Sequence, residues 1–203
     1  LTTGITLLTA AQTQFSSITL SGDAQLISDH SLTVAGDIRV SGSARIKIDG
    51  ILTAEGDVTT QNSGVIEKRT SGGIIILRLT GASTQTLDLA GTDGNFQGNV
   101  IAEGADIRLG SPLEVGGALT INSGVFDLNQ STPLRVTGPT IVSGTLNAAG
   151  PSPSNLTFGS LSILSGGNFV AGTGTVTVNG DLNVAAGAQF AASSDAMYVN
   201  ANT

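Results

Sequence analysis

The chain has 203 residues with 28 glycines, no cysteine, no tryptophan and one histidine, and its formal net charge is -7. The lack of cysteine excludes disulfides and thiolate metal sites. With only eight Lys and Arg residues in an acidic chain, nucleic acid is not an expected partner, because phosphate binding needs clustered positive charge. The sequence contains no run of 18 or more apolar residues, so it predicts no transmembrane helix. A mean hydropathy of +0.26 is too apolar for a disordered chain, so we expect it to fold.

Residues 1–17 are expected to form an N-terminal cap or lead-in segment. The chain begins at Leu1 without a methionine or a basic leader, which favours a processed mature end or an excised fragment. Residues 18–203 contain short period-2 runs rich in Val, Ile, Leu and Thr, separated by Gly, Asn and Ser. Such runs predict short strands joined by tight turns, so the chain is predicted to be all-β, with one domain over residues 1–203.

A small or polar residue followed by glycine recurs nine times at nearly even intervals. The glycines are Gly22, Gly42, Gly64, Gly81, Gly104, Gly124, Gly144, Gly166 and Gly187. Two other markers keep a similar spacing. LTVAGD begins at Leu32 and LTAEGD at Leu52, and a Leu-x-Val-like motif starts at Leu113, Leu134, Leu156, Val176 and Met197.

A period of about 21 residues with two or three short strands matches one coil of a parallel β-solenoid, in which each strand pairs with its counterpart in the next coil. We therefore predict a parallel β-helix of about nine or ten coils. The competing all-β architecture is an antiparallel sandwich, with a turn about every 8–12 residues. A sandwich does not require similar residues at matching positions in every period.

The glycines are predicted to form corners, since glycine adopts positive φ and lets backbones approach closely. The corner residues singled out are Gly22, Gly42, Gly64, Gly124, Gly144 and Gly166. The apolar residue after a corner should point inward. We therefore expect an interior ladder of Phe126, Leu146, Phe169 and Phe190, extended toward the N-terminus by Ile66.

The runs STQTLDLAG, VGGALTINSGVFDLNQSTPLRVTGP and GGNFVAGTGTVTVNGDLNV resemble the repeats of secreted bacterial surface proteins. These include filamentous-haemagglutinin-like adhesins, autotransporter passengers and surface-fibre β-solenoids. The resemblance covers residues 79–199 and, more loosely, 18–67. It implies a right-handed parallel β-helix at the cell surface or outside the cell. A glycan or host-surface component is the class of ligand to consider, although no particular ligand is implied.

The end of the sequence, MYVNANT, starts a further coil at Met197, and neither end shows a capping helix or a charge cluster. An open solenoid end exposes an apolar cross-section and unpaired strand edges. We therefore expect either a longer rod or subunits that associate end to end into a fibre.

Catalytic chemistry finds little support in the sequence. Arg45-Ile46-Lys47 resembles the motif of polygalacturonases in which a basic pair grips a substrate carboxylate, but those enzymes also need a close trio of Asp and a Gly-His-Gly. The one histidine, His30, has no flanking glycine, and no Asp-Asp pair exists. The Arg45-Ile46-Lys47 motif is interpreted as a strand with one solvent-exposed face, and Lys68-Arg69 is interpreted as a loop. No catalytic residue is predicted.

Asp88, Asp93 and Asn95 could supply oxygen ligands for Ca²⁺. Asp and Asn beside Gly are usually turn formers, and the tandem calcium-binding nonapeptide is missing, so no metal or cofactor is predicted. Four aspartates that follow glycines could align as an acidic ladder, but are interpreted as solvated corner residues because stacked like charges repel. They are Asp23, Asp37, Asp57 and Asp181.

The sequence therefore predicts a non-enzymatic structural or adhesive segment of an extracellular surface protein or fibre. Two other functions stay open. A carbohydrate-active β-helix enzyme would need a cleft lined by carboxylates, and a cytoskeletal β-solenoid polymer of the bactofilin kind would share end-to-end assembly but be cytoplasmic.

Overall fold

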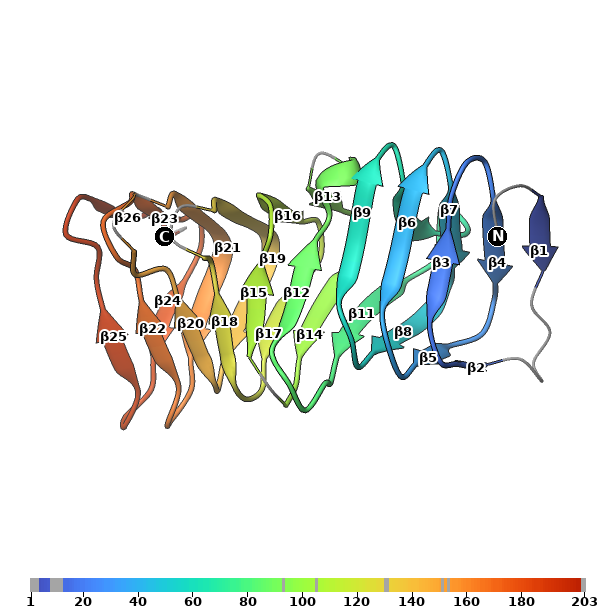
Figure 1. Cartoon of the computed structure of the whole chain (residues 1–203). Coiled ribbons are helices and arrows are strands. Elements are labelled where there is room, and N and C mark those ends of the chain that lie inside the picture. The colour runs from blue at the N-terminus through green and yellow to red at the C-terminus, as the bar shows by residue number, and fades with distance from the viewer. Residues whose placement is uncertain are drawn as a thin grey trace.

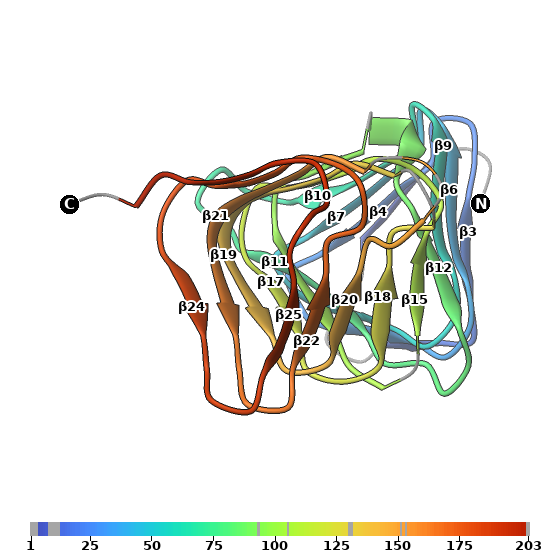
Figure 2. The same cartoon turned by 90° about the vertical axis from the view of Figure 1, so that its left-hand side faces the viewer.

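The chain winds into a rod of stacked coils (Figure 1), and a view along the rod shows the coils enclosing a common interior (Figure 2). The structure is a computed structural model that describes residues 4–7, 13–92, 94–104, 106–129, 132–150, 152 and 154–201. It has about nine turns of about 21 residues and almost no helix. Neighbouring strands pair in parallel, as between β5 (Leu32–Val34) and β8 (Gly50–Ala54). The predicted parallel β-solenoid is confirmed, and the antiparallel sandwich is wrong.

Each coil contributes to three faces of the rod, which we call the first, second and third face in chain order. The third face is a nine-stranded sheet of β3 (Ile18–Leu20), β6 (Ile38–Gly42), β9 (Val58–Asn62), β12 (Gln85–Asp88), β15 (Ile107–Leu109), β18 (Val125–Asp127), β20 (Thr145–Asn147), β22 (Asn168–Val170) and β25 (Gln189–Ala191). The second face is equally continuous. Its strands are β2 (Gln14–Phe15), β5, β8, β11 (Ile75–Leu79), β14 (Asn99–Ala102), β17 (Leu119–Ile121), the later parts of β19 (Leu134–Val142) and β21 (Leu156–Ile163), and β24 (Leu182–Val184).

The first face is divided into two parts. Its N-terminal part is a four-stranded sheet of β1 (Ile5–Leu7), β4 (Gln25–Ser28), β7 (Arg45–Ile48) and β10 (Val65–Lys68). After the 3-10 turn η1 (Ala90–Thr92), its C-terminal part contains β13 (Asn95–Phe96), β16 (Leu113–Val115), the starts of β19 and β21, β23 (Val176–Val178) and β26 (Met197–Val199). We number the coils by the first-face strand that begins each one, so β10 begins coil 4 and β13 begins coil 5. Within residues 1–17, β1 and β2 pair with β4 and β5 of the next coil.

Similar residues stack in the interior because the coils pair in register. Strands alternate inward and outward side chains, so Leu32 and Val34 are buried while Thr33 between them is half-buried. The ladder that starts at Leu32 continues through Leu52, Leu77, Val100, Leu119, Thr140, Leu161 and Leu182. The buried aliphatic and aromatic residues of all three faces form one core along the rod.

The aromatic ladder lies on the third face. Phe126 pairs with Leu146, Leu146 with Phe169, and Phe169 with Phe190. The Phe169 ring stacks on Phe190 with a centroid distance of 5.3 Å, and it meets Phe158 edge to face at 6.1 Å. These contacts place the four residues expected from the sequence in a single column.

The corner glycines serve two different needs. Gly22, Gly42, Gly124 and Gly166 have positive φ, which is 70° at Gly42. Gly64 and Gly144 instead lie against the preceding coil, since a Cβ on Gly64 would stand 2.3 Å from the carbonyl oxygen of Val40. In the Gly64 corner the left-handed residue is Asn62, with φ 58°.

The Ser-Gly marker changes corner along the chain. Gly22, Gly42 and Gly64 connect the third face to the first, whereas the later markers connect the second face to the third. The change falls in coil 4, because the chain from Val58 to its partner Leu87 is longer than the chain from Ile38 to its partner Val58. Ile66 therefore stacks on Ile46 in the first face, and it does not extend the aromatic ladder, which continues to Ile107 and Gln85.

Candidate functional site

Polar side chains at the corners bind the backbone of the neighbouring coil. Asp37 accepts a hydrogen bond from the Asp57 amide at 2.9 Å, and Asn155 accepts one from the Thr175 amide at 3.1 Å. Amide groups at a corner lie outside the strand ladders, so a carboxylate or amide oxygen one coil away satisfies them. These side chains act as clamps between coils.

The four glycine-flanked aspartates do not form one ladder. Asp37 and Asp57 stack at the corner before the third face, and Asp37 also pairs with Arg39 at 2.6 Å. Asp23 lies before β4, at the corner that leads into the first face, and Asp181 lies before β24 in the second face. The coil geometry therefore aligns only Asp37 and Asp57, although all four aspartates follow a glycine.

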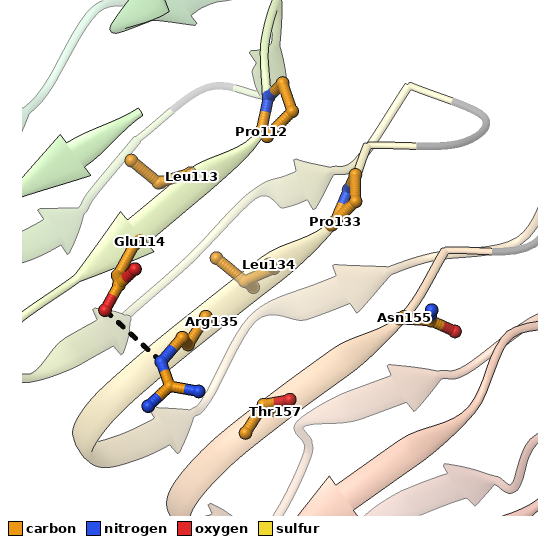
Figure 3. Close-up of a pocket in the computed structure, with 8 residues that line it drawn as sticks. All are labelled: Pro112, Leu113, Glu114, Pro133, Leu134, Arg135, Asn155 and Thr157. Carbon is orange, nitrogen blue, oxygen red and sulfur yellow. Dashed lines mark ion pairs between the residues drawn. The ribbon is translucent and has the colours of Figure 1, made fainter. Parts of the chain in front are cut away.

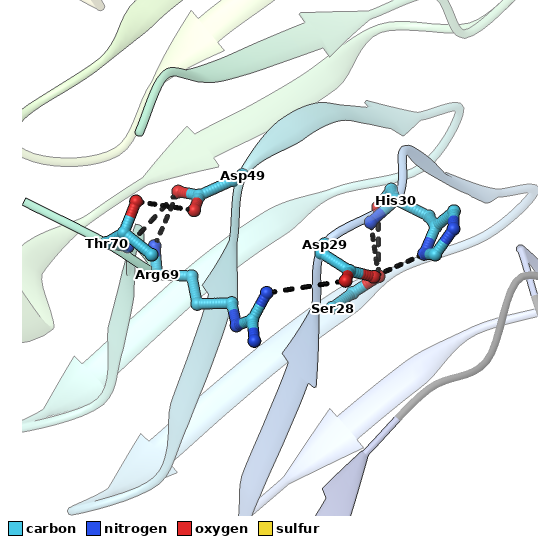
Figure 4. A network of polar contacts seen from close by, with 6 residues as sticks. All are labelled: Ser28, Asp29, His30, Asp49, Arg69 and Thr70. Atoms are coloured by element: carbon cyan, nitrogen blue, oxygen red, sulfur yellow. Dashed lines mark hydrogen bonds and ion pairs between the residues drawn. The ribbon is translucent and has the colours of Figure 1, made fainter. Parts of the chain in front are cut away.

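A cluster of polar side chains lies at the corner between the first and second faces (Figure 4). Asp49 accepts hydrogen bonds from the Thr70 hydroxyl at 2.8 Å, the Arg69 amide at 3.0 Å and the Thr70 amide at 3.3 Å. These bonds, above all the one from the Thr70 hydroxyl, lower the pKa of the half-buried Asp49 carboxyl. The Arg69 guanidinium reaches Asp29, two coils away, at 3.5 Å.

The same cluster contains Ser28, Asp29 and His30, the residue types of a hydrolytic triad. His30 Nδ1 lies 2.5 Å from Asp29 Oδ1, but the Ser28 hydroxyl donates to the backbone carbonyl of His30 at 2.9 Å. In a working triad the hydroxyl would instead face an imidazole nitrogen. Ser28 is also 1% exposed, so this arrangement closes a turn and presents no nucleophile to a substrate.

The basic pair of the Arg45-Ile46-Lys47 motif faces an acidic partner. Glu67 Oε1 lies 2.9 Å from Arg45 Nη1 and 3.9 Å from Lys47 Nζ. Ile46 is fully buried between them, which is the alternation of a strand with one wet face. Glu67 therefore occupies the position that a substrate carboxylate would need.

The oxygen ligands considered for Ca²⁺ are engaged locally. Asp88 Oδ1 accepts a hydrogen bond from the Ala90 amide at 3.1 Å, which caps the η1 turn, and Asn95 accepts one from Gln97. Asp93 lies outside the described residues. Among the residues described, no group of three His, Cys, Asp or Glu side chains is placed to hold a metal ion.

A shallow hollow of about 250 Å³ lies on the outside of the C-terminal first face (Figure 3). Pro112 and Pro133 occupy equivalent positions in consecutive coils, and Arg135 Nε pairs with Glu114 Oε1 at 3.2 Å. Asn155 and Thr157 from the following coil complete the polar lining. Two proline rings beside a neutralised ion pair, an amide and a hydroxyl suit an uncharged ligand rich in hydroxyl groups, so this hollow is the candidate binding site of the C-terminal coils.

The ion pairs between coils were not predicted from the sequence. Arg78 Nε lies 2.7 Å from Glu103 Oε2, and this bond lowers the pKa of Glu103. Among the described residues, six of the eight basic side chains have a carboxylate within 4.0 Å, and all of them except Arg39 pair with a different coil; they are Arg39, Arg45, Lys47, Arg69, Arg78 and Arg135. Opposite charges one coil apart, as in Glu114 and Arg135, were the available signal.

Comparison of the chain with protein-family models, with curated proteins and with solved structures gave no match. Within the part of the chain that the structure describes, no helix has the length and apolar character needed to cross a membrane.

Proposed function

We propose that the chain is a non-enzymatic structural and adhesive segment of an extracellular or cell-surface protein or fibre. The observation that supports this role best is the continuous ladder from Leu32 to Leu182, which joins consecutive coils by parallel hydrogen bonds and a shared apolar interior. A rod held together in this way can project a binding surface away from its attachment point without a cofactor.

End-to-end association is part of the proposal. At the C-terminal end of the described rod, Val184 in β24 and Val199 in β26 occupy inward ladder positions, yet they are 42% and 44% exposed. A further coil, from the same chain or from a second copy, would cover both side chains and pair with the strand edges beside them.

The adhesive part of the proposal places a neutral glycan in the hollow beside Glu114 and Arg135. The two side chains offer paired donors and acceptors for sugar hydroxyls, and Pro112 and Pro133 offer an apolar platform. The two side chains neutralise each other, so the pair has no net charge that would favour a charged ligand. An Arg135→Ala variant should therefore lose glycan retention while keeping the rod intact.

Electron microscopy of the purified chain is the main test. We expect rods about one coil wide that lengthen with concentration, and monodisperse compact particles at high concentration would contradict end-to-end association. Fractionation of the source cells should place the protein outside the cell or at its surface. Recovery from the cytoplasm would favour a bactofilin-like polymer, and release of reducing ends or unsaturated sugars from a glycan panel would favour the enzyme.

A further inference from the structure

The first face is interrupted in the middle of the rod. Its N-terminal sheet ends at β10, which pairs with β7, and its C-terminal part starts at β13, which pairs with β16. No pairing joins β10 to β13 among the described residues, although the second and third faces continue past this point. Each of these two strands therefore has an edge without a strand partner. An unpaired edge is a template for another extended chain.

The interruption follows from unequal lengths of chain in coils 4 and 5. The coils are in close contact on both sides of the interruption: a Cβ on Gly91 would lie 2.5 Å from the carbonyl oxygen of Gly64, and one on Gly98 would lie 2.5 Å from that of Ile75. Between these contacts coil 4 has ten residues, 65–74, and coil 5 has six, 92–97. The longer segment cannot follow the shorter one, so β10 and the loop after it separate from coil 5.

A hollow of about 330 Å³ lies where the coils separate. Lys68, at the end of β10, and Ile74, in the following loop, line it together with four glycines and the amides of Gln97 and Asn99. Ile74 is 65% exposed, the highest value among the large apolar residues that the structure describes. No acidic side chain is among the described residues that line the hollow.

Lys68 differs from most basic residues of the chain. Six of the eight have a carboxylate within 4.0 Å, but no described carboxylate pairs with Lys68. A lysine without a described counter-ion beside a strand edge offers a local positive charge to an acidic side chain of a partner segment. The exposed Ile74 offers a partner segment an apolar contact beside this charge.

We propose that this junction binds an extended acidic segment of another protein by strand addition. The segment pairs its backbone with the edge of β10, packs an apolar side chain on Ile74 and places an Asp or Glu against Lys68. Main-chain bonds supply affinity and the alternating side chains supply specificity in this mode of recognition. The site goes beyond the proposed function, because it requires neither a surface location nor a glycan.

The test is selection of displayed random heptapeptides on the intact chain, followed by affinity measurements with the enriched peptides. We expect alternating apolar residues with at least one Asp or Glu. Affinity should fall at least tenfold in Lys68→Ala and in Ile74→Ser, and should be unchanged in Arg108→Ala, which removes a cation on the third face that likewise has no described ion-pair partner. Circular dichroism checks that each variant keeps its fold.

Strand addition is tested separately by methylating alternate backbone nitrogens of the best peptide. Two peptides are compared, one methylated at the odd-numbered backbone nitrogens and one at the even-numbered ones. Methylation removes hydrogen-bond donors and leaves the side chains unchanged, so one of these two registers should lose binding. The proposal is overturned by an absence of enriched peptides, by binding that survives both registers, or by binding that Lys68→Ala and Ile74→Ser leave intact. Concentration-dependent dimers that Ile74→Ser abolishes would reassign the edge to a second copy of this chain and equally overturn the proposed partner.

Discussion

The first four coils and the last four share a backbone architecture but differ in what fills and covers it. The first three of these N-terminal coils repeat at an even interval on the third face, from Ile18 to Ile38 to Val58. Their interior is largely aliphatic, with Ile46 and Leu52 fully buried. Their outer surface carries ion pairs between coils, such as Arg45 with Glu67.

The C-terminal coils replace charge with aromatic packing. From Val136 onward only Asp181 and Asp195 are charged. In the interior, Phe169 contacts Phe158 and Phe190, and such aromatic pairs add about 0.5–1.5 kcal/mol each beyond the area they bury.

This difference shows that the solenoid constrains position more strongly than chemistry. Main-chain pairing fixes where a side chain lies, and any residue that suits an inward or outward site can then occupy it. The two halves should consequently respond differently to loss of core volume, to added bulk at corners and to acid, and each response can be measured.

The largest effect is expected in the aromatic ladder. Replacing the fully buried Phe169 by Ala removes contacts with two rings and leaves a cavity, which should lower the free energy of unfolding by about 3–5 kcal/mol. Chemical denaturation measures the change. Phe190→Ala is the matched control, since Phe190 is only partly buried and should cost less. An unchanged midpoint in Phe169→Ala would reject the ladder.

The stability lost on replacing a corner glycine by alanine should depend on why glycine is needed at that corner. A Cβ at Gly64 meets the Val40 carbonyl oxygen at 2.3 Å, so Gly64→Ala forces the backbones apart and should cost up to about 3 kcal/mol. Gly166 has φ 82° and no atom within 4 Å of the position that a Cβ would take, so Gly166→Ala should cost only the left-handed strain of about 1–2 kcal/mol. Equal losses in thermal denaturation would contradict this distinction.

A buried hydroxyl offers a stabilising substitution. Thr140 Oγ1 is buried in an apolar ladder without a hydrogen-bond partner, whereas Thr60 Oγ1 accepts a bond from the Gly91 amide at 3.1 Å. Thr140→Val should therefore raise the free energy of unfolding by about 1 kcal/mol, and Thr60→Val should lower it by a similar amount. Destabilisation by Thr140→Val would mean that its hydroxyl has a partner.

The period, the all-β class and the aromatic column were predictable because stacking places similar residues one coil apart. The corner to which each glycine belongs was not predictable, since a tight turn needs the same Ser-Gly between any two faces. Because of that ambiguity, Ile66 was predicted to lie in the wrong face. The spacing between the Gly64 and Gly81 markers is also short, so it gave no sign that coil 4 is long. The interruption between β10 and β13 depends on chain length between contacts that only the fold reveals.

The polar sites were partly readable from the sequence. Asp29, Asp49 and Arg69 are evenly spaced along the chain, so the period alone was enough to predict that they lie in one column, although this was not predicted. It did not show that the Asp49 carboxylate would bind backbone amides while Arg69 reached past it to Asp29. Side-chain direction at a corner depends on local turn geometry, which the repeat does not encode.

The smallest expected effect is a pH dependence that arises from the charged part of the rod. The pKa values of Asp49 and Glu103 are lowered in the folded chain, chiefly by hydrogen bonds from Thr70 and Arg78. A carboxyl with a lowered folded pKa stabilises the fold above its ordinary pKa of about 4, and that contribution disappears as the pH falls through the folded pKa. The denaturation midpoint should therefore decrease as the pH falls below about 4. Asp49→Asn should reduce this decrease, and Asp181→Asn, whose carboxylate has no described partner, should leave it unchanged; identical pH profiles for Asp49→Asn and the parent chain would contradict the assignment.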